Sequence, residues 1–211
     1  MTILMAMSVY PSEGKPYSLM VADSMRTEVY YNSNKEFGDY EFAGQAFKQD
    51  VQKLHKINKN LIIGFEGEFR GRIHHKLISN LNNIINPTDN LHAIHNKVVK
   101  EIINLFPKGQ LLEEAQYSMI MSGFIDGIPS LSKTVFRDNE IVENRFQTPN
   151  KGNFSIIFDP HVTPEMAEQF REKVKYYNSV SFFRKEFVNL AKAASKYSTG
   201  SNDNIKVERL K

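Results

Sequence analysis

The order of sequence patterns predicts an α+β protein in which two antiparallel sheets are covered by two pairs of helices. Strand-like segments form two groups, within residues 2–65 and 117–158, and two segments with helical spacing follow each group. Turn sequences such as Asp126-Gly127 join neighbouring strands, which indicates antiparallel hairpins. Segregated strands and helices are typical of α+β folds, and helix pairs on the outer faces give helix, sheet, sheet and helix layers.

The first group of strands begins at residues 2–10, a nearly continuous apolar run typical of a strand buried on both faces. A turn precedes the returning strand of residues 17–22, which ends at Asp23. Residues 51–57 and 60–65 predict a second, tightly connected strand pair. Residues 32–44 are polar and aromatic and contain glycine, so they are interpreted as irregular.

The remaining elements follow from periodicity and from their boundaries. Apolar spacing predicts helices near residues 69–85 and 91–105, and Thr163 followed by Pro164 predicts the start of a third. Further strands are expected at residues 117–125, 130–136, 140–146, 154–158 and 205–210, and a fourth helix around residues 183–194. With no internal repeat or linker, we expect one domain over residues 1–211.

Composition narrows the class of protein. With 41% hydrophobic and 24% charged residues, the 211 residues suit a soluble domain with a real core. A net charge of +3 without a long Lys/Arg run does not argue for a nucleic-acid partner. There is no cysteine, no stretch of transmembrane length and no signal-peptide pattern, so we expect a cytoplasmic protein that does not bind a membrane.

No cofactor is expected, because neither a phosphate-binding loop nor a dinucleotide fingerprint is present. Asp89, His92 and His95 have a spacing that can place metal ligands on one helix face. A solvated helix surface explains the same spacing better, so no metal is expected.

Thr2 is the first residue with potential catalytic chemistry. Removal of Met1 would give Thr2 a free α-amine, whose pKa of about 8 lets it act as a base close to neutral pH. A threonine activated by its own amine is a known nucleophile. From residue type alone, the better interpretation is an ordinary residue at the start of a strand.

Four short motifs, taken in order, resemble the proteasome family of N-terminal-nucleophile hydrolases, especially the bacterial peptidase subunit that works with an unfoldase ATPase. Residues 2–7 (Thr-Ile-Leu-Met-Ala-Met) resemble the family's first strand, and residues 21–26 (Val-Ala-Asp-Ser-Met-Arg) its Ala-Asp-Ser/Gly segment. Residues 53–58 (Lys-Leu-His-Lys-Ile-Asn) resemble its lysine strand, and residues 63–67 (Ile-Gly-Phe-Glu-Gly) its turn into the first helix. Each motif is weak alone, but by the order of its strands and helices the resemblance covers nearly the whole chain.

The resemblance implies a proteasome-like four-layer αββα sandwich and a set of site residues. By it, Thr2 is the nucleophile, Asp23 an orienting carboxylate and Lys53 the neighbouring cation that lowers the pKa of the threonine hydroxyl. The amide of Gly64 is a candidate oxyanion donor. Ser201 corresponds to the serine that the family places before its last strand.

The chain also departs from the family pattern. Ser198 stands where the family has an aspartate before the last strand, and residues 154–160 lack its Gly-Ser-Gly loop. Glu66 stands where the family keeps a small residue. If Glu66 faces the substrate pocket, it would favour basic side chains; if not, it is a surface carboxylate.

The sequence therefore leaves three hypotheses. The first is a threonine peptidase or amidohydrolase; the resemblance then implies a homo-oligomeric ring, a peptide substrate and an ATPase unfoldase partner. The second is a non-catalytic proteasome-like ring subunit that keeps the fold alone, and the third is an unprocessed binding protein on the same scaffold. The alternative for each residue is structural: Asp23 only ends a strand, Gly64 and Gly67 only pack, and Lys53 is a solvated lysine, with Lys48 and Lys56 as near rivals for its role.

Overall fold

The computed structural model describes residues 2–33, 40–67, 71–105, 116–137, 140–175, 179–198 and 201–211. One of its sheets has four antiparallel strands in the order β10-β1-β2-β11. These strands are β1 (Leu4–Tyr10), β2 (Tyr17–Asp23), β10 (Asn153–Ile157) and β11 (Ile205–Leu210). The apolar run at the start of the chain thus forms a central strand, and β1 and β2 are buried almost throughout.

The second sheet has five antiparallel strands in the order β5-β6-β7-β8-β9. They are β5 (Leu54–Ile57), β6 (Leu61–Gly67), β7 (Gln116–Ile125), β8 (Ile128–Arg137) and β9 (Glu140–Gln147). Asp126 and Gly127 both have positive φ, at 50° and 77°, as a tight hairpin between β7 and β8 requires. The predicted strand of residues 51–57 begins later, at Leu54, and leaves residues 51–53 outside the ladder.

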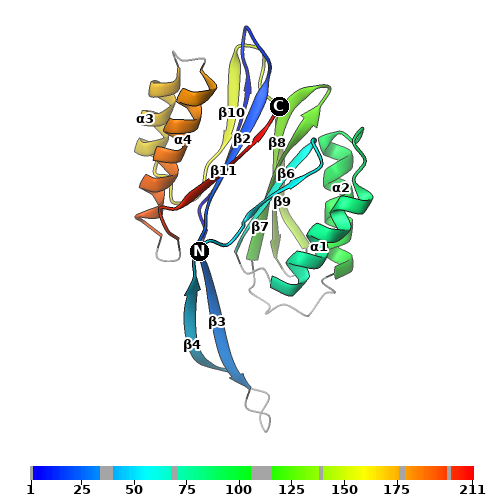
Figure 1. The fold of residues 1–211 in the computed structure, drawn as a ribbon, viewed down its shortest axis with the longest axis vertical. Helices are drawn as coiled ribbons and strands as arrows, with labels where there is room; N and C mark the ends of the chain where they lie inside the picture. The colour runs from blue at the N-terminus through cyan, green and yellow to red at the C-terminus, as the bar shows by residue number, and fades with distance from the viewer. Residues whose placement is uncertain are drawn as a thin grey trace.

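The helices of the described residues form two pairs on different sheets (Figure 1). Helices α1 (Gly71–Ile84) and α2 (Leu91–Leu105) lie on the five-stranded sheet, and α3 (Pro164–Val174) and α4 (Val180–Ser195) lie beside the four-stranded sheet. The predicted start of α3 is confirmed, because the Thr163 hydroxyl accepts a hydrogen bond from the Met166 amide and Pro164 begins the helix.

Three apolar clusters fill the spaces between these elements. One joins α1 and α2 to the five-stranded sheet, and another joins α3 and α4 to the four-stranded sheet. The third contains residues of both sheets, including Leu4, Met20, Leu54 and Ile120. The prediction of an α+β protein with two antiparallel sheets and four helices is therefore confirmed at this level.

The prediction of an irregular segment at residues 32–44 is wrong for residues 32–33 and 40–44, and residues 34–39 lie outside the described residues. There the chain forms a separate two-stranded antiparallel sheet, β3 (Arg26–Ser33) and β4 (Tyr40–Lys48), with a register shift between Tyr30 and Tyr31. This hairpin projects from the body of the molecule beside the N-terminal end of the chain (Figure 1). Its polar and glycine-containing sequence lacks the apolar pattern of a strand buried in a core, which explains why it escaped prediction.

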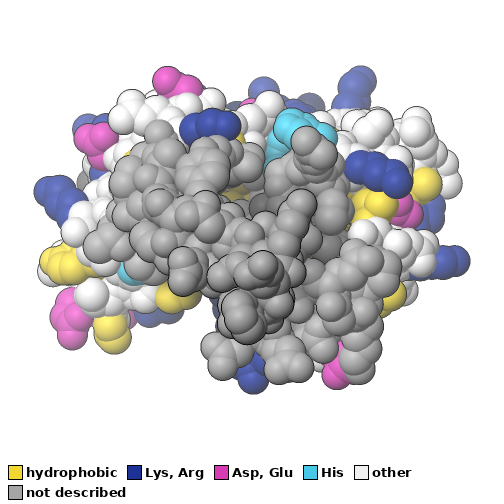
Figure 2. All heavy atoms as spheres, turned by 90° about the horizontal axis from the view of Figure 1, so that it is seen from below, with side chains coloured by type: hydrophobic (Ala, Val, Ile, Leu, Met, Phe, Trp, Pro, Cys, Tyr) yellow, Lys and Arg dark blue, Asp and Glu magenta, His cyan; other side chains and the backbone are white. Residues whose placement is uncertain are grey.

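The face seen along the hairpin carries charges of both signs. In Figure 2, described Lys, Arg, Asp and Glu side chains are interspersed around the rim of this face.

No helix in the described part of the chain is long and apolar enough to cross a membrane.

Gly64 lies against the Leu4 side chain of the other sheet, and this contact yields a prediction about the fold. A Cβ at this position would lie 2.8 Å from Leu4 Cδ1 and 3.1 Å from Leu54 Cδ2. We expect Gly64→Ala to lower the free energy of unfolding by about 1–3 kcal/mol, as overpacking of a core does. Chemical denaturation measures this change. The added methyl group should cost less in a Leu4→Ala background; an equal cost in both backgrounds would contradict the packing explanation.

Candidate functional site

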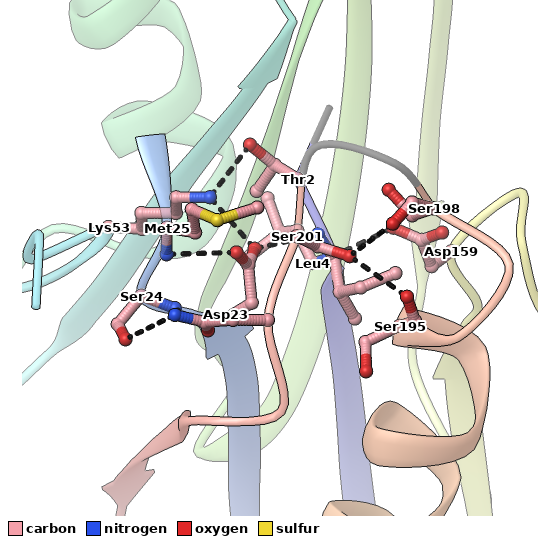
Figure 3. A network of polar contacts seen from close by, with 12 residues as sticks. Thr2, Leu4, Asp23, Ser24, Met25, Lys53, Asp159, Ser195, Ser198 and Ser201 are labelled. Atoms are coloured by element: carbon pink, nitrogen blue, oxygen red, sulfur yellow. Dashed lines mark hydrogen bonds and ion pairs between the residues drawn. The ribbon is translucent and has the colours of Figure 1, made fainter. Parts of the chain in front are cut away.

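Three of the predicted site residues meet at the N-terminal end of β1. Lys53 Nζ lies 3.0 Å from Thr2 Oγ1 and 2.8 Å from Asp23 Oδ1, so one ammonium group contacts both the hydroxyl and the carboxylate (Figure 3). The three residues come from separate segments: Thr2 precedes β1, Asp23 ends β2, and Lys53 directly precedes β5.

Asp23 is held by the backbone on both of its carboxylate oxygens. Its Oδ1 accepts a hydrogen bond of 2.9 Å from the Ile3 amide, and its Oδ2 accepts one of 3.0 Å from the Met25 amide. The Asp23 amide in turn donates to the Ile3 carbonyl at 3.1 Å. Asp23 is fully buried, so these contacts and Lys53 take the place of water. The side chain therefore does more than end a strand.

Lys53 is almost enclosed, with 10% of its side chain exposed. Burial lowers the pKa of its ammonium group, while Asp23 and, at longer range, Asp159 act in the opposite direction. The side chain is thus not solvated, unlike that of Lys56, which is exposed. A lysine of this kind places a positive charge beside Thr2 Oγ1 and gives up its proton more easily than a surface lysine.

A second buried carboxylate, Asp159, lies near the same strand end. Its Oδ2 accepts a hydrogen bond of 3.0 Å from the Leu4 amide, and its Oδ1 contacts both the His161 amide at 2.8 Å and His161 Nδ1 at 2.7 Å. The sequence analysis missed this residue, since an aspartate before Pro160 reads as an ordinary turn between β10 and α3. Leu4 and Asp159 are 155 residues apart in the sequence, so no local pattern predicts their contact.

Ser201 lies in the segment between α4 and β11. Its hydroxyl donates to the carbonyl groups of Ser195 and Ser198, at 3.4 and 3.5 Å. In the same segment, the Asn202 side chain accepts a 3.2 Å hydrogen bond from the Ser24 amide, next to Asp23. Ser201 thus lies in the polar network of Figure 3, where its hydrogen bonds connect this segment to the end of α4.

Gly64 lies inside β6 and pairs with Leu54 of β5 and with Ile120 of β7. Its Cα faces Leu4 across the gap between the sheets, where a side chain has no room. Packing therefore accounts for a glycine at this position without any role in binding an oxyanion.

Glu66 is largely buried and does not project as a surface carboxylate. It accepts a hydrogen bond from the Ser118 hydroxyl, and Lys133 Nζ lies 3.6 Å from its Oε1. Burial raises the pKa of Glu66, and the lysine and the serine partly offset this effect. Because Lys133 already balances its charge, Glu66 is a poor counter-ion for a basic substrate side chain.

The three residues considered as metal ligands, Asp89 just before α2 and His92 and His95 on it, have other contacts. Asp89 Oδ2 lies 2.6 Å from Lys97 Nζ, the His92 ring packs against Phe146, and His95 Nε2 lies 2.8 Å from the Thr134 hydroxyl. Within the described ranges, no cluster of three or more His, Asp or Glu side chains could hold a metal ion.

With this geometry established, the fold can be compared with known structures. It is similar to that of Anbu (ancestral beta-subunit) from Yersinia bercovieri, with a TM-score of 0.54 and 10% sequence identity; the match covers 97% of this chain and 80% of that one. Neither a protein-family model nor a curated protein sequence matches the chain. At this identity the likeness is one of fold alone.

The buried contact between Asp23 and Lys53 generates a stability prediction. Asp23→Ala leaves the Lys53 ammonium group buried without its carboxylate, so the free energy of unfolding should fall by about 3–5 kcal/mol. Adding Lys53→Met should recover part of the loss. As a matched control, Glu168→Ala removes the ion-pair partner of Arg171. The Glu168 side chain is 65% exposed and that of Arg171 is 52% exposed, so the free energy of unfolding should change by less than about 1 kcal/mol. Equal effects of Asp23→Ala and Glu168→Ala in urea denaturation would contradict this account.

Proposed function

We propose that this chain is a proteasome-like threonine peptidase or amidohydrolase that uses Thr2 as its nucleophile after removal of Met1. The observation that carries the proposal is the contact of Lys53 Nζ with both Thr2 Oγ1 and Asp23 Oδ1. Met1 itself lies outside the described residues.

The proposed reaction begins with attack of Thr2 Oγ1 on an amide carbonyl carbon. The hydroxyl proton passes to the free α-amine of Thr2, and the collapse of the tetrahedral intermediate transfers a proton to the departing amine. The product is an ester between Thr2 and the acyl part of the substrate. Water then attacks this ester, restores the hydroxyl and releases a carboxylic acid.

Lys53 would assist by its charge. A cation 3.0 Å from the hydroxyl oxygen lowers the pKa of that hydroxyl and stabilises the negative charge that develops on it. Asp23 keeps the ammonium group in this position and compensates for its burial. Because burial lowers the pKa of Lys53, a neutral amine is also more accessible there than on a surface lysine.

The proposal extends to architecture and assembly. The three apolar clusters are those that a single domain of four layers, helix, sheet, sheet and helix, would need. By the resemblance of its motifs to the proteasome family, such a domain would assemble into a homo-oligomeric ring, receive peptide substrates and work with an ATPase unfoldase.

A non-catalytic ring or binding subunit on the same fold is the second candidate. Gly64 favours it, because this glycine is explained by its contact with Leu4 and its amide belongs to a strand paired on both sides. Under this alternative, Lys53 and Asp23 only stabilise the start of β1.

Covalent labelling separates the two candidates. We expect a threonine-directed electrophile, such as a peptide epoxyketone, to add one equivalent to Thr2 in the chain that begins at Thr2, measured by intact mass. Thr2→Ala should abolish the adduct. Lys53→Ala should slow its formation about a hundredfold or more, within the range of a lost proton-transfer or charge contribution.

Two controls complete this experiment. Lys56→Ala removes a neighbouring exposed lysine and should leave the labelling rate unchanged. Circular dichroism should establish that each variant is folded. If the folded chain beginning at Thr2 forms no adduct, or if the purified native protein uniformly retains Met1, the peptidase proposal fails and the non-catalytic candidate stands.

A further inference from the structure

A groove of about 740 Å³ lies between helix α4 and the edge of the four-stranded sheet. Strand β11 forms its sheet side, and this strand has β2 as a neighbour but no second neighbour among the strands that the structure describes. Helix α4 lies beside β11 (Figure 1). The volume is typical of ligand-binding pockets, and the lining residues do not belong to the site around Thr2. The groove is therefore a separate candidate for binding.

The register of β11 shows which of its backbone groups point out of the sheet. Ile205 pairs with Asp23, whose amide donates to the segment just before β1, away from β11. This pair is therefore not hydrogen-bonded, and alternation along an antiparallel ladder extends the same geometry to Val207 and Arg209. The Arg209 carbonyl accepts a hydrogen bond from Lys56. Val207 thus presents both a donor and an acceptor at the outer edge of β11.

The floor of the groove is apolar. Val207 lies on the face of the sheet that α4 covers, because its partner in β2 is Val21, which packs in the same cluster as residues of α3 and α4. Leu19 of β2 lies on this face too, and Val180 and Val188 line the groove from α4. These side chains can take apolar groups of a bound molecule out of water.

The charged side chains that line the groove are predominantly cations. Arg184 and Lys185 line it from α4 and are exposed, and Arg209 adds a third positive charge from β11. Glu208 also lines the groove, but its partner in β2 is Met20, which belongs to the cluster between the two sheets. Its carboxylate is therefore directed to the opposite face of β11. The groove favours a ligand that carries negative charge.

Arg209 is the cation whose position is fixed by packing. Its guanidinium carbon lies 4.9 Å from the centre of the Tyr17 ring. Its Nε is buried and has no hydrogen-bond partner among the described residues. A guanidinium group holds its donors in a planar fork that matches a carboxylate. An arginine stacked in this way is suited to bind one carboxylate at a defined place along β11.

We propose that this groove binds an extended, acidic segment of a partner protein. The segment pairs with Val207 as an additional strand on the outer edge of β11, and it places a carboxylate on Arg209. Arg184 and Lys185 attract the acidic segment, and the apolar floor receives its central side chain. Charge complementarity favours this occupant over a second copy of the chain, whose net charge is +3. The inference does not depend on catalysis at Thr2.

A titration followed by NMR tests the inference, with the blocked peptide acetyl-Asp-Thr-Val-Thr-Asp-amide as the probe. Its central residue pairs with Val207, and an aspartate two residues away then lies opposite Arg209 in either strand direction. The full chain carries Thr2→Ala, so that the peptide is not cleaved. We expect saturable shifts of the Val207 and Arg209 amide signals and an affinity that falls as salt is added. The absence of saturable binding would overturn the proposal.

Two control peptides separate charge from strand pairing. Replacing both aspartates by lysine should weaken binding by about tenfold or more, because the cations of the groove repel it. Replacing the central valine by proline removes the backbone donor that meets Val207 and should weaken binding by a similar factor. Equal affinity of the proline peptide would show that side-chain charge alone is recognised, and it would contradict the added strand.

Reversal of the two exposed charges on α4 provides the matched protein variant. Arg184→Glu with Lys185→Glu should weaken the acidic peptide by about tenfold or more and improve the affinity for the lysine peptide. Lys192→Glu changes an exposed lysine of the same helix outside the groove, and it should leave both affinities unchanged. Unchanged binding in the reversed variant would overturn the proposal. Self-association that this variant loses in sedimentation experiments would assign the groove to a second copy of the chain instead.

Discussion

The Asp23 carboxylate cannot reach water, and the geometry of the site depends on how this buried charge is satisfied. Burying an unpaired carboxylate costs several kcal/mol, so its donors must be fixed in place. Three segments supply them: the Ile3 amide before β1, the Met25 amide after β2 and Lys53 before β5. Since the Lys53 ammonium group is held there, its further contact with Thr2 follows from the position of Asp23. One carboxylate thereby aligns two sheets and the start of the chain.

Residues at strand ends were the part of the site that the sequence could predict. The apolar runs define β1, β2 and β6, and Thr2, Asp23 and Lys53 each stand at or just before a strand boundary within an ordered motif. The hairpin of β3 and β4 was missed because its strands hydrogen-bond with each other and belong to neither core sheet, so they lack the apolar pattern of a buried strand.

Contacts between distant segments explain the remaining differences. A glycine at position 64 suits either an oxyanion donor or a close approach of two sheets, and only the packing of Leu4 distinguishes these roles. Likewise, nothing in the sequence near Glu66 predicts a partner for its carboxylate. Its partners depend on the register of the five-stranded sheet, which places Ser118 opposite Glu66 and brings Lys133 near it. Asp159 depends on the pairing of β10 with β1, which no local pattern specifies.

The two buried carboxylates act on the same strand end from opposite edges. Asp23 takes the Ile3 amide and Asp159 takes the Leu4 amide, so β1 is fixed immediately after Thr2. Ordinary strand pairing would satisfy these amides without burying two negative charges close to each other, which is unfavourable by itself. Further partners offset this cost. Lys53 Nζ lies against Asp23, and His161 contacts Asp159 through its backbone amide and Nδ1, so each carboxylate has partners besides an amide at the start of the chain.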